Sequence, residues 1–354
     1  MQKRIKKVYD LMEQEGLEAL LIDSAENRYY LTAFTGTAGR VLFTGKGAYF
    51  ITDFRYVEQA SKQTRGYEIV EISSNFEKGL KELLQKDGVK RLAFESKAIT
   101  HDQYLKYKEG LEVELQKTTD LIEGLRLIKE EEEIEKIRKA VEITDEAFAH
   151  ILDFIKPGVS ERDLALELEF FQKRKGGEKN AFDFIVASGQ RSSLPHGVAT
   201  DKVIEKGDFV TMDFGVFYQG YCSDLTRTVV VGEPTEEQKK IYDLVLKAQL
   251  AVIERIKPGM TCQEVDEIAR GIIGEAGYRE NFGHGLGHGI GLEVHEGPRL
   301  SFASEEILKP GMVVTNEPGI YIPQWGGVRI EDDLLITAEG CEVLNKAVKE
   351  LIIL

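Results

Sequence analysis

One stretch of this chain occurs twice, and the repetition limits the folds that the chain can adopt. Residues 207–215 (GDFVTMDFG) return 104 residues later as residues 311–319 (GMVVTNEPG). Both copies keep the first Gly, a Val-Thr pair, one carboxylate and the last Gly. The carboxylate, Asp213 or Glu317, occupies the same place in an otherwise apolar strand. Because a buried carboxylate is costly unless a charge compensates it, the two carboxylates predict one shared site with a metal ion.

Each copy continues as a strand, a Gly-containing turn and a second strand, which is the pattern of a β-hairpin. A turn centred on residues 218–219 is predicted to place Asp213 opposite Asp224. Opposed residues have Cβ atoms roughly 5 Å apart, so two carboxylates there repel each other unless a proton or a cation intervenes. In the second copy Glu331 follows Glu317. Two facing hairpins therefore predict four carboxylates around a dication.

The duplication extends beyond the hairpins. The segment Ile155–Gly158 (IKPG) recurs as Ile256–Gly259, and each marks the end of a predicted helix. A capping box follows, at Ser160 in one copy and at Thr261 in the other, and it starts the next helix. Two units of helix, helix, strand, histidine and hairpin, related by a pseudo-twofold axis, bring both hairpins to a common centre.

Histidines gather in and beside the duplicated units. The segment Phe282–Gly291 has Gly at every second position, which disfavours a helix and lets a ligand approach the backbone closely. His284 and His288 are an even number of residues apart, so on an extended strand both side chains point to the same face. Four of the six histidines belong to this group: His196, His284, His288 and His295.

Composition narrows the class of protein. The chain has 354 residues, 42% of them hydrophobic and 30% charged, as in an ordinary globular protein of two domains. The formal net charge of −15 argues against nucleic-acid and anionic-membrane partners. Three scattered cysteines indicate no disulfide framework, and no run of 18 apolar residues or signal-peptide pattern occurs. We therefore expect a cytoplasmic protein.

The first 124 residues alternate helical and strand patterns, which predicts a compact α/β domain. Strands are expected at residues 17–22, 41–43, 47–52 and 91–94, and helices at residues 5–14 and 76–86. The acidic run Glu130–Glu133 then opens a long amphipathic helix. We place the boundary near residues 120–128, with domains at 1–124 and 125–354.

Several common motifs are absent: GxGxxG, the P-loop, HExxH and GxSxG. The order of the acidic residues and one histidine instead resembles the "pita-bread" metallopeptidases, the family of methionine aminopeptidase, aminopeptidase P, prolidase and the metal-free creatinase. Residues 52–56 (TDFRY) look like the N-terminal domain of creatinase and prolidase. The resemblance implies an α/β N-terminal domain and an α+β pita-bread catalytic domain with internal pseudo-twofold duplication. Its five metal-ligand positions are all filled, by Asp213, Asp224, His288, Glu317 and Glu331.

The same resemblance implies a role for each ligand. Asp213 and Asp224 hold one metal and bridge to the second, and His288 is a terminal ligand on the second. Glu317 binds the second metal and also acts as acid/base partner, while Glu331 bridges. Four carboxylates roughly balance two dications, and an oxygen-rich set with one imidazole suits Mn first, with Co, Fe or Zn as alternatives. Two such ions activate a water for attack on a carbonyl at neutral pH.

Further site residues follow from the resemblance, and four of them have a structural alternative. His196 and His295 steady the carbonyl oxygen of the substrate, and His284 lines the substrate pocket or only packs in the Gly-rich segment. Tyr321 and Arg329 orient the ligating carboxylates, or are a plain strand aromatic and a structural ion pair. Arg299 clamps the free carboxylate of a dipeptide, or is a surface arginine.

The extra N-terminal domain separates this chain from ordinary methionine aminopeptidases. The resemblance then implies cleavage before proline, a residue whose missing N–H and fixed φ make it a poor substrate for general peptidases. We expect an Xaa-Pro dipeptidase (prolidase), with aminopeptidase P, which acts on longer peptides, as the alternative. A non-catalytic binding protein on the same fold is the alternative of another class. The resemblance also implies a homodimer.

Overall fold

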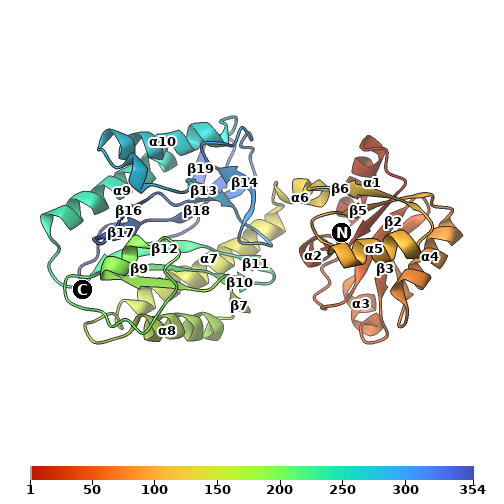
Figure 1. Ribbon diagram of the computed structural model, residues 1–354, viewed down its shortest axis with the longest axis horizontal. Helices are drawn as coiled ribbons and strands as arrows, with labels where there is room; N and C mark the ends of the chain where they lie inside the picture. The colour runs from red at the N-terminus through yellow and green to blue at the C-terminus, as the bar shows by residue number, and fades with distance from the viewer. Residues whose placement is uncertain (1) are drawn as a thin grey trace. The chain divides into compact units, whose positions relative to one another are not determined.

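The structure is a computed structural model that describes residues 2–354. The chain divides into two compact units, the first ending at Arg126 and the second running from Leu127 to Leu354 (Figure 1). The sequence had placed this boundary after residue 124. Within residues 2–354, no helix is both long enough and apolar enough to cross a membrane.

The first unit is a mixed six-stranded sheet with strand order β4-β3-β2-β1-β5-β6, accompanied by six helices (Figure 1). Strand β1 pairs antiparallel with β2 and parallel with β5, so the sheet combines hairpin and crossover connections. Its strands are β1 (Ala19–Ile22), β2 (Arg40–Thr44), β3 (Gly47–Thr52), β4 (Glu68–Glu71), β5 (Arg91–Glu95) and β6 (Glu114–Thr118). Its helices are α1 (Gln2–Gln14), α2 (Ala25–Thr32), α3 (Val57–Gln63), α4 (Phe76–Asp87), α5 (His101–Gly110) and α6 (Leu121–Arg126).

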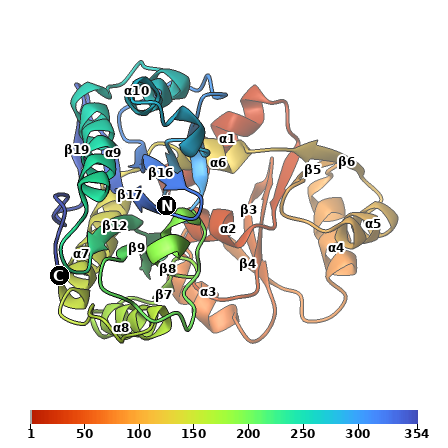
Figure 2. The same cartoon turned by 60° about the vertical axis from the view of Figure 1, so that its left-hand side comes forward.

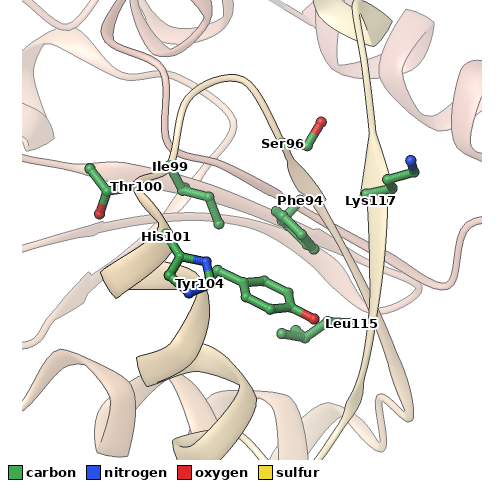
Figure 3. A pocket seen from close by; sticks show the side chains of 8 residues that line it. All are labelled: Phe94, Ser96, Ile99, Thr100, His101, Tyr104, Leu115 and Lys117. Atoms are coloured by element: carbon green, nitrogen blue, oxygen red, sulfur yellow. The ribbon is translucent and has the colours of Figure 1, made fainter.

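A cavity of about 480 Å³ lies in the first unit, where β5, β6 and the start of α5 meet (Figure 3). Phe94, Tyr104 and Leu115 supply its apolar wall, and His101 and Lys117 add polar groups. None of the residues that line it is among the site residues predicted from the sequence. All of those predicted site residues lie in the second unit, between residues 127 and 354.

The second unit contains two similar halves, each with two helices and a hairpin-bearing sheet. The first half has α7 (Glu131–Ile151), α8 (Glu161–Arg174), β7 (Lys179–Asn180), β8 (Ile185–Ser188), η1 (Gly189–Ser193), β9 (Phe209–Phe214), β10 (Val216–Tyr218), β11 (Tyr221–Cys222) and β12 (Leu225–Val230). The second half has α9 (Glu236–Arg255), α10 (Cys262–Glu275), η2 (Arg279–Asn281), β13 (Gly287–Gly289), β14 (Glu296–Leu300), β15 (Val313–Asn316), β16 (Gly319–Ile322), β17 (Gly326–Arg329), β18 (Asp332–Ile336) and β19 (Cys341–Val343).

The pairing of strands repeats between the halves. The first half contains the order β8-β9-β12, and the second contains the matching order β13-β15-β18 within a five-stranded sheet. Each half builds its own core, because α7 and α8 pack on the first set of strands and α9 and α10 on the second. Figures 1 and 2 show α8 and α10 on opposite sides of these strands. The two predicted capping boxes, at Ser160 and Thr261, are confirmed.

The register predicted for the first hairpin is wrong by two residues. Its turn is formed by Gln219 and Gly220, not by residues 218–219, and Asp213 faces Thr226 instead of Asp224. Both turn residues have positive φ, 46° and 76°, as a two-residue hairpin loop requires, and Gly provides this conformation without steric cost. Asp224 remains on the same face as Asp213 but is its diagonal neighbour.

The register also shows which residues of the two hairpins are equivalent. In the second hairpin Asn316 faces Asp332, so the pairing continues to Glu317 and Glu331. Because Asp213 and Glu317 are repeat positions, their partners Thr226 and Glu331 are equivalent too. Two residues earlier on those strands, Asp224 is equivalent to Arg329. The two hairpins therefore carry their second carboxylates at positions that do not match.

Candidate metal centre

The centre of the second unit gathers acids from both hairpins around one imidazole. One ligand atom each of Asp224, His288 and Glu331 lies within 4.8 Å of the others, and all three residues are buried. His288 Nε2 lies 3.5 Å from Glu317 Oε1 and 3.8 Å from Asp224 Oδ2. Asp213 joins this group through Arg329, whose Nη2 donates a hydrogen bond to Asp213 Oδ2 over 2.6 Å.

The hydrogen bonds of His288 fix which of its ring nitrogens holds a proton. Nδ1 lies 3.1 Å from the carbonyl oxygen of Gly289, which only accepts hydrogen bonds, so Nδ1 carries the hydrogen. Burial lowers the pKa of His288 to about 3, so the imidazole is neutral at pH 7. The lone pair of Nε2 therefore points at two carboxylates. Such a ring, oriented by a backbone carbonyl, is the usual form of a metal-ligating histidine.

Two carboxylates of this centre have an oxygen without a hydrogen-bond donor, and burial disfavours the charged form of the acids. Burial and the nearby acids Glu331 and Asp213 raise the pKa of Asp224 well above its ordinary value. For Glu331, burial and the Glu317 carboxylate raise the pKa in the same way. Within residues 2–354, neither Asp213 Oδ1 nor Asp224 Oδ1 receives a hydrogen bond. Two orphaned oxygens among four crowded acids fit divalent cations, which remove the repulsion.

A neighbouring acid shows how the protein compensates a carboxylate without a metal. Asp332 follows Glu331 and points to the opposite face of the strand. It is paired with Arg227 Nη2 at 2.8 Å and with Lys349 Nζ at 3.2 Å, and Gln249 donates a further hydrogen bond. The acids on the metal-centre face have Arg329 as their paired guanidinium, and it contacts Asp213.

Arg329 is the start of a directed chain of hydrogen bonds. Its Nη1 donates to Tyr321 Oη over 2.7 Å, and Tyr321 Oη lies 2.9 Å from His284 Nε2. His284 Nδ1 lies 2.7 Å from the carbonyl oxygen of Gly285, so Nδ1 holds the hydrogen and Nε2 accepts from Tyr321. Both ring nitrogens of His284 are therefore engaged inside the protein.

The expectation that His284 and His288 share one strand face is wrong. Strand β13 covers only Gly287–Gly289, and His284 lies before it. The buried Arg270 donates hydrogen bonds to the carbonyl oxygens of Phe282 and His284, at 2.8 and 2.7 Å, and so holds this segment out of the ladder. His284 consequently contacts Tyr321, whereas His288 faces the acids.

His196 is held by a loop that a buried carboxylate closes. Glu161, fully buried in the first turn of α8, accepts hydrogen bonds from the N–H of Ser188 at 2.7 Å and of Thr200 at 3.1 Å. These residues flank the loop at its two ends. The carbonyl oxygen of Pro195 accepts a hydrogen bond from Arg329 Nη1 over 3.2 Å. His196 is exposed and lies near enough to lower the pKa of both His284 and His295.

His295 and Arg299 lie on the His288 side of the centre. The rings of His288 and His295 have centroids 4.4 Å apart and meet edge to face. Arg299 pairs with His288 across β13 and β14, and both Arg299 and His295 are exposed. Although the residue is exposed, part of the His295 ring is desolvated by its surroundings, and this desolvation and the Arg299 guanidinium lower its pKa, which keeps the imidazole neutral. His295 and Arg299 thus present an uncharged imidazole and a guanidinium at the exposed side of His288.

Sequence reasoning missed the threonines that hold the carboxylates. Thr226 Oγ1 donates to Glu331 Oε2 over 2.6 Å, and Thr315 Oγ1 donates to Glu317 Oε1 over 3.3 Å. Thr315 also accepts a hydrogen bond from the N–H of His288 at 3.0 Å. The signal for Thr315 was its place in the repeated Val-Thr pair, two residues before the acid. Thr226 had no signal until the register placed it opposite Asp213.

Comparisons with known proteins agree with this geometry. Residues 135–338 match metallopeptidase family M24, and residues 4–128 match the creatinase/prolidase N-terminal domain. A curated Xaa-Pro dipeptidase of Pyrococcus horikoshii is 45% identical over 355 residues, which cover 99% of each chain.

Solved structures extend the likeness to the whole fold. An Xaa-Pro dipeptidase from Bacillus anthracis superposes with a TM-score of 0.98 at 52% identity, covering 100% of this chain and 99% of that one. An X-Pro aminopeptidase from Thermotoga maritima gives a TM-score of 0.90 at 39% identity, covering 96% of this chain and 98% of that one. These likenesses confirm the expected fold class, an α/β N-terminal domain followed by a pita-bread domain.

Proposed function

Because the chain belongs to metallopeptidase family M24, we propose that it hydrolyses the peptide bond between an N-terminal residue and proline, as an Xaa-Pro dipeptidase. The observation that carries this proposal is a group of four carboxylates, two of them buried and two partly buried, around one neutral imidazole. Two of the carboxylate oxygens receive no hydrogen bond from the described residues. The full-length likeness to Xaa-Pro dipeptidases at 45% and 52% identity supports the choice of substrate.

We propose that the centre holds two divalent metal ions, manganese first, with Co, Fe or Zn as alternatives. An oxygen-rich donor set with one imidazole supports this choice. When bound, the ions polarise the scissile carbonyl and lower the pKa of the attacking water. The residues assigned as ligands are Asp213, Asp224, His288, Glu317 and Glu331.

The side chains around the ligands have separate tasks. Glu317 accepts a proton from the attacking water and passes it to the leaving nitrogen of proline. His196 and His295 donate hydrogen bonds to the carbonyl oxygen, and their exposure beside the centre supports this role. Arg329 and Tyr321 orient Asp213.

His284, which the resemblance assigns to the substrate pocket, is proposed to act through Tyr321. Both of its ring nitrogens are already hydrogen-bonded inside the protein, which leaves none for a substrate.

We assign the free carboxylate of the dipeptide to Arg299. A guanidinium can hold a carboxylate through two parallel hydrogen bonds, and Arg299 is exposed directly opposite His288. The alternative is aminopeptidase P activity on longer peptides, and the likeness to the X-Pro aminopeptidase at 39% identity supports it. In longer peptides the proline carbonyl is part of a further peptide bond, so the Arg299 guanidinium has no free carboxylate to bind there.

We also propose a cellular compartment and an oligomeric state for the enzyme. Three free cysteines, two of them buried, and a net charge of −15 support a cytoplasmic enzyme without nucleic-acid or membrane partners. A homodimer is proposed on the family resemblance, and the oligomeric state is measurable by light scattering.

The test compares hydrolysis of Xaa-Pro and Xaa-Pro-Yaa by purified protein, with added Mn²⁺ and after exhaustive chelation. We expect dipeptide turnover that chelation abolishes and Mn²⁺ restores. Activity that survives chelation contradicts the metal mechanism. Preference for the tripeptide, together with an Arg299→Ala variant that hydrolyses dipeptides normally, favours aminopeptidase P. A freshly purified, unchelated sample without metal or activity favours the non-catalytic binding protein.

A further inference from the structure

One hydroxyl group joins side chains of the two hairpins at the candidate metal centre. Thr226 Oγ1 donates to Glu331 Oε2 over 2.6 Å and accepts a hydrogen bond from Arg329 Nε over 2.9 Å. All three residues are buried. Thr226 belongs to the first copy of the duplicated unit, whereas Arg329 and Glu331 belong to the second.

The residues that hydrogen-bond to the Thr226 hydroxyl occupy repeat positions of the duplicated unit. Thr226 occupies the position equivalent to Glu331, and Arg329 occupies the position equivalent to Asp224, because the registers of the two hairpins coincide. The main chain makes the same connection, since the N–H of Glu331 donates to the carbonyl oxygen of Thr226 over 3.1 Å. Thr226 is therefore tied to its own repeat counterpart by both backbone and side chain.

A reciprocal contact runs in the opposite direction. Asp333, two residues after Glu331, accepts a hydrogen bond from the N–H of Asp224 through Oδ2 over 3.0 Å. Thr226 itself lies two residues after Asp224. In each hairpin, the residue two positions after a candidate ligand thus reaches across to a candidate ligand of the other hairpin.

We propose that Thr226 is a positioning residue that sets the affinity of the centre for metal. Its hydroxyl can donate only one hydrogen, and because Arg329 Nε occupies its oxygen as a donor, that hydrogen is directed at Glu331. The contact holds one carboxylate oxygen in place and leaves the other for a cation. This inference rests on the proposed metal centre and adds a residue that the five-ligand pattern does not contain.

The direct test is Mn²⁺ binding by chelator-stripped protein, measured by isothermal titration calorimetry. Thr226→Val keeps the shape but removes the hydroxyl, and we expect its dissociation constant to rise about 10–100-fold, as for other groups that orient a ligand. Thr226→Ser keeps the hydroxyl and is expected to bind within about threefold of the wild type. Excess Mn²⁺ should restore much of the activity of Thr226→Val.

Thr228→Val is the matched control. Thr228 lies on the same strand and face and is equally buried, but its hydroxyl bonds Thr211 and the main chain of Arg329, not a carboxylate. We expect it to lose stability without weakening Mn²⁺ binding.

Four experimental results would overturn the inference about Thr226. Wild-type affinity in Thr226→Val, or equal weakening in Thr226→Val and Thr226→Ser, overturns the inference while the proposed function stands. Absence of Mn²⁺ binding by the wild type overturns both. If Thr226→Val does not fold, Thr226→Ala replaces it in the same comparison. Thr228→Val weakened as strongly as Thr226→Val shows a general packing effect and also overturns the inference.

Discussion

The two hairpins of the duplicated unit share a backbone plan but not a charge pattern. The first carries Asp213 and Asp224, with Thr226 opposite Asp213. The second carries Glu317 opposite Glu331, and Arg329 at the position equivalent to Asp224. Two identical copies would bring two pairs of equivalent acids together with no internal cation. The actual difference places one guanidinium among four acids.

This difference explains how one centre is built from two similar halves. Where the two hairpins meet, Thr226 lies beside its counterpart Glu331. Arg329 lies beside Thr228, and Asp224 lies beside Asp333. Arg329 compensates Asp213 and is held by Thr226. Asp224, Glu317 and Glu331 have pKa values that burial raises. These three acids, and the Oδ1 atom of Asp213, are left for cations. The difference between the copies thus provides one internal cation for one carboxylate oxygen and leaves the other oxygens for ligand binding.

The largest loss of activity is expected from replacing Asp224 or Glu331, the two acids that do not occupy equivalent positions in the hairpins. Asp224→Asn and Glu331→Gln each remove a ligand charge, and we expect each to lower kcat/KM by about 10³-fold or more, which corresponds to about 4 kcal/mol. Steady-state kinetics with metal content measured by mass spectrometry checks this. If either variant keeps more than a tenth of wild-type activity at full metal occupancy, that acid is not a ligand.

The next largest effect is expected from replacing Arg329, the guanidinium that has no counterpart in the first hairpin. Arg329→Lys keeps the charge but cannot reach the acceptors that the guanidinium serves, and we expect kcat/KM to fall about 10–100-fold. Arg329→Met also leaves Asp213 buried without a cation, which costs about 3 kcal/mol of stability in the metal-free protein. Kinetics and urea denaturation in chelator separate these effects. Equal stability of the Lys and Met variants contradicts the pairing.

Tyr321→Phe makes the second hairpin resemble the first, because Phe217 occupies the equivalent position. The change removes the hydroxyl that joins Arg329 to His284. We expect a loss of about 1–2 kcal/mol in transition-state stabilisation, near tenfold in kcat/KM, since a buried donor and acceptor lose their partner. The reverse variant, Phe217→Tyr, has no such partners and is the control. Unchanged kcat/KM in Tyr321→Phe excludes a role for the hydroxyl.

The smallest effects are expected at the turns. Gly220 has φ of +76°, and Gly220→Ala should lower the free energy of unfolding by about 1 kcal/mol. Gln324, in the other turn, has φ of +65° although it is not a glycine. Gln324→Gly relieves this backbone strain but also raises the conformational entropy of the unfolded chain. Because the two effects oppose each other, the free energy of unfolding should change by no more than about 0.5 kcal/mol. Urea denaturation of both variants measures the difference. A destabilisation of similar size in both contradicts the assigned turn conformations.

Much of the site was predictable because its signals are local. The repeated segments indicated Asp213 and Glu317, the hairpin pattern added Asp224 and Glu331, and the family resemblance completed the five ligand positions with His288. The structure brings all five into one region of the second unit. The first hairpin register was missed by two residues, since turn preference alone does not choose between residues 218–219 and Gln219–Gly220. The path before β13 was also missed, because it depends on Arg270, which belongs to a helix and is close to that segment only in the folded chain.

The sequence by itself determined the two-domain plan, the internal duplication and the identity of the candidate ligands, because helix signals, strand periodicity and repeated motifs are read along the chain. Only the tertiary structure decided that Arg329 is the counterpart of Asp224, that Thr226 holds Glu331, and that His284 belongs to Tyr321. Thr226 and Glu331 are 105 residues apart in the chain, and His284 and Tyr321 are 37 residues apart. Which of these residues meet depends on strand register and on the path of the segment before β13. A shift of two residues in pairing changes every such partner while leaving the sequence pattern untouched.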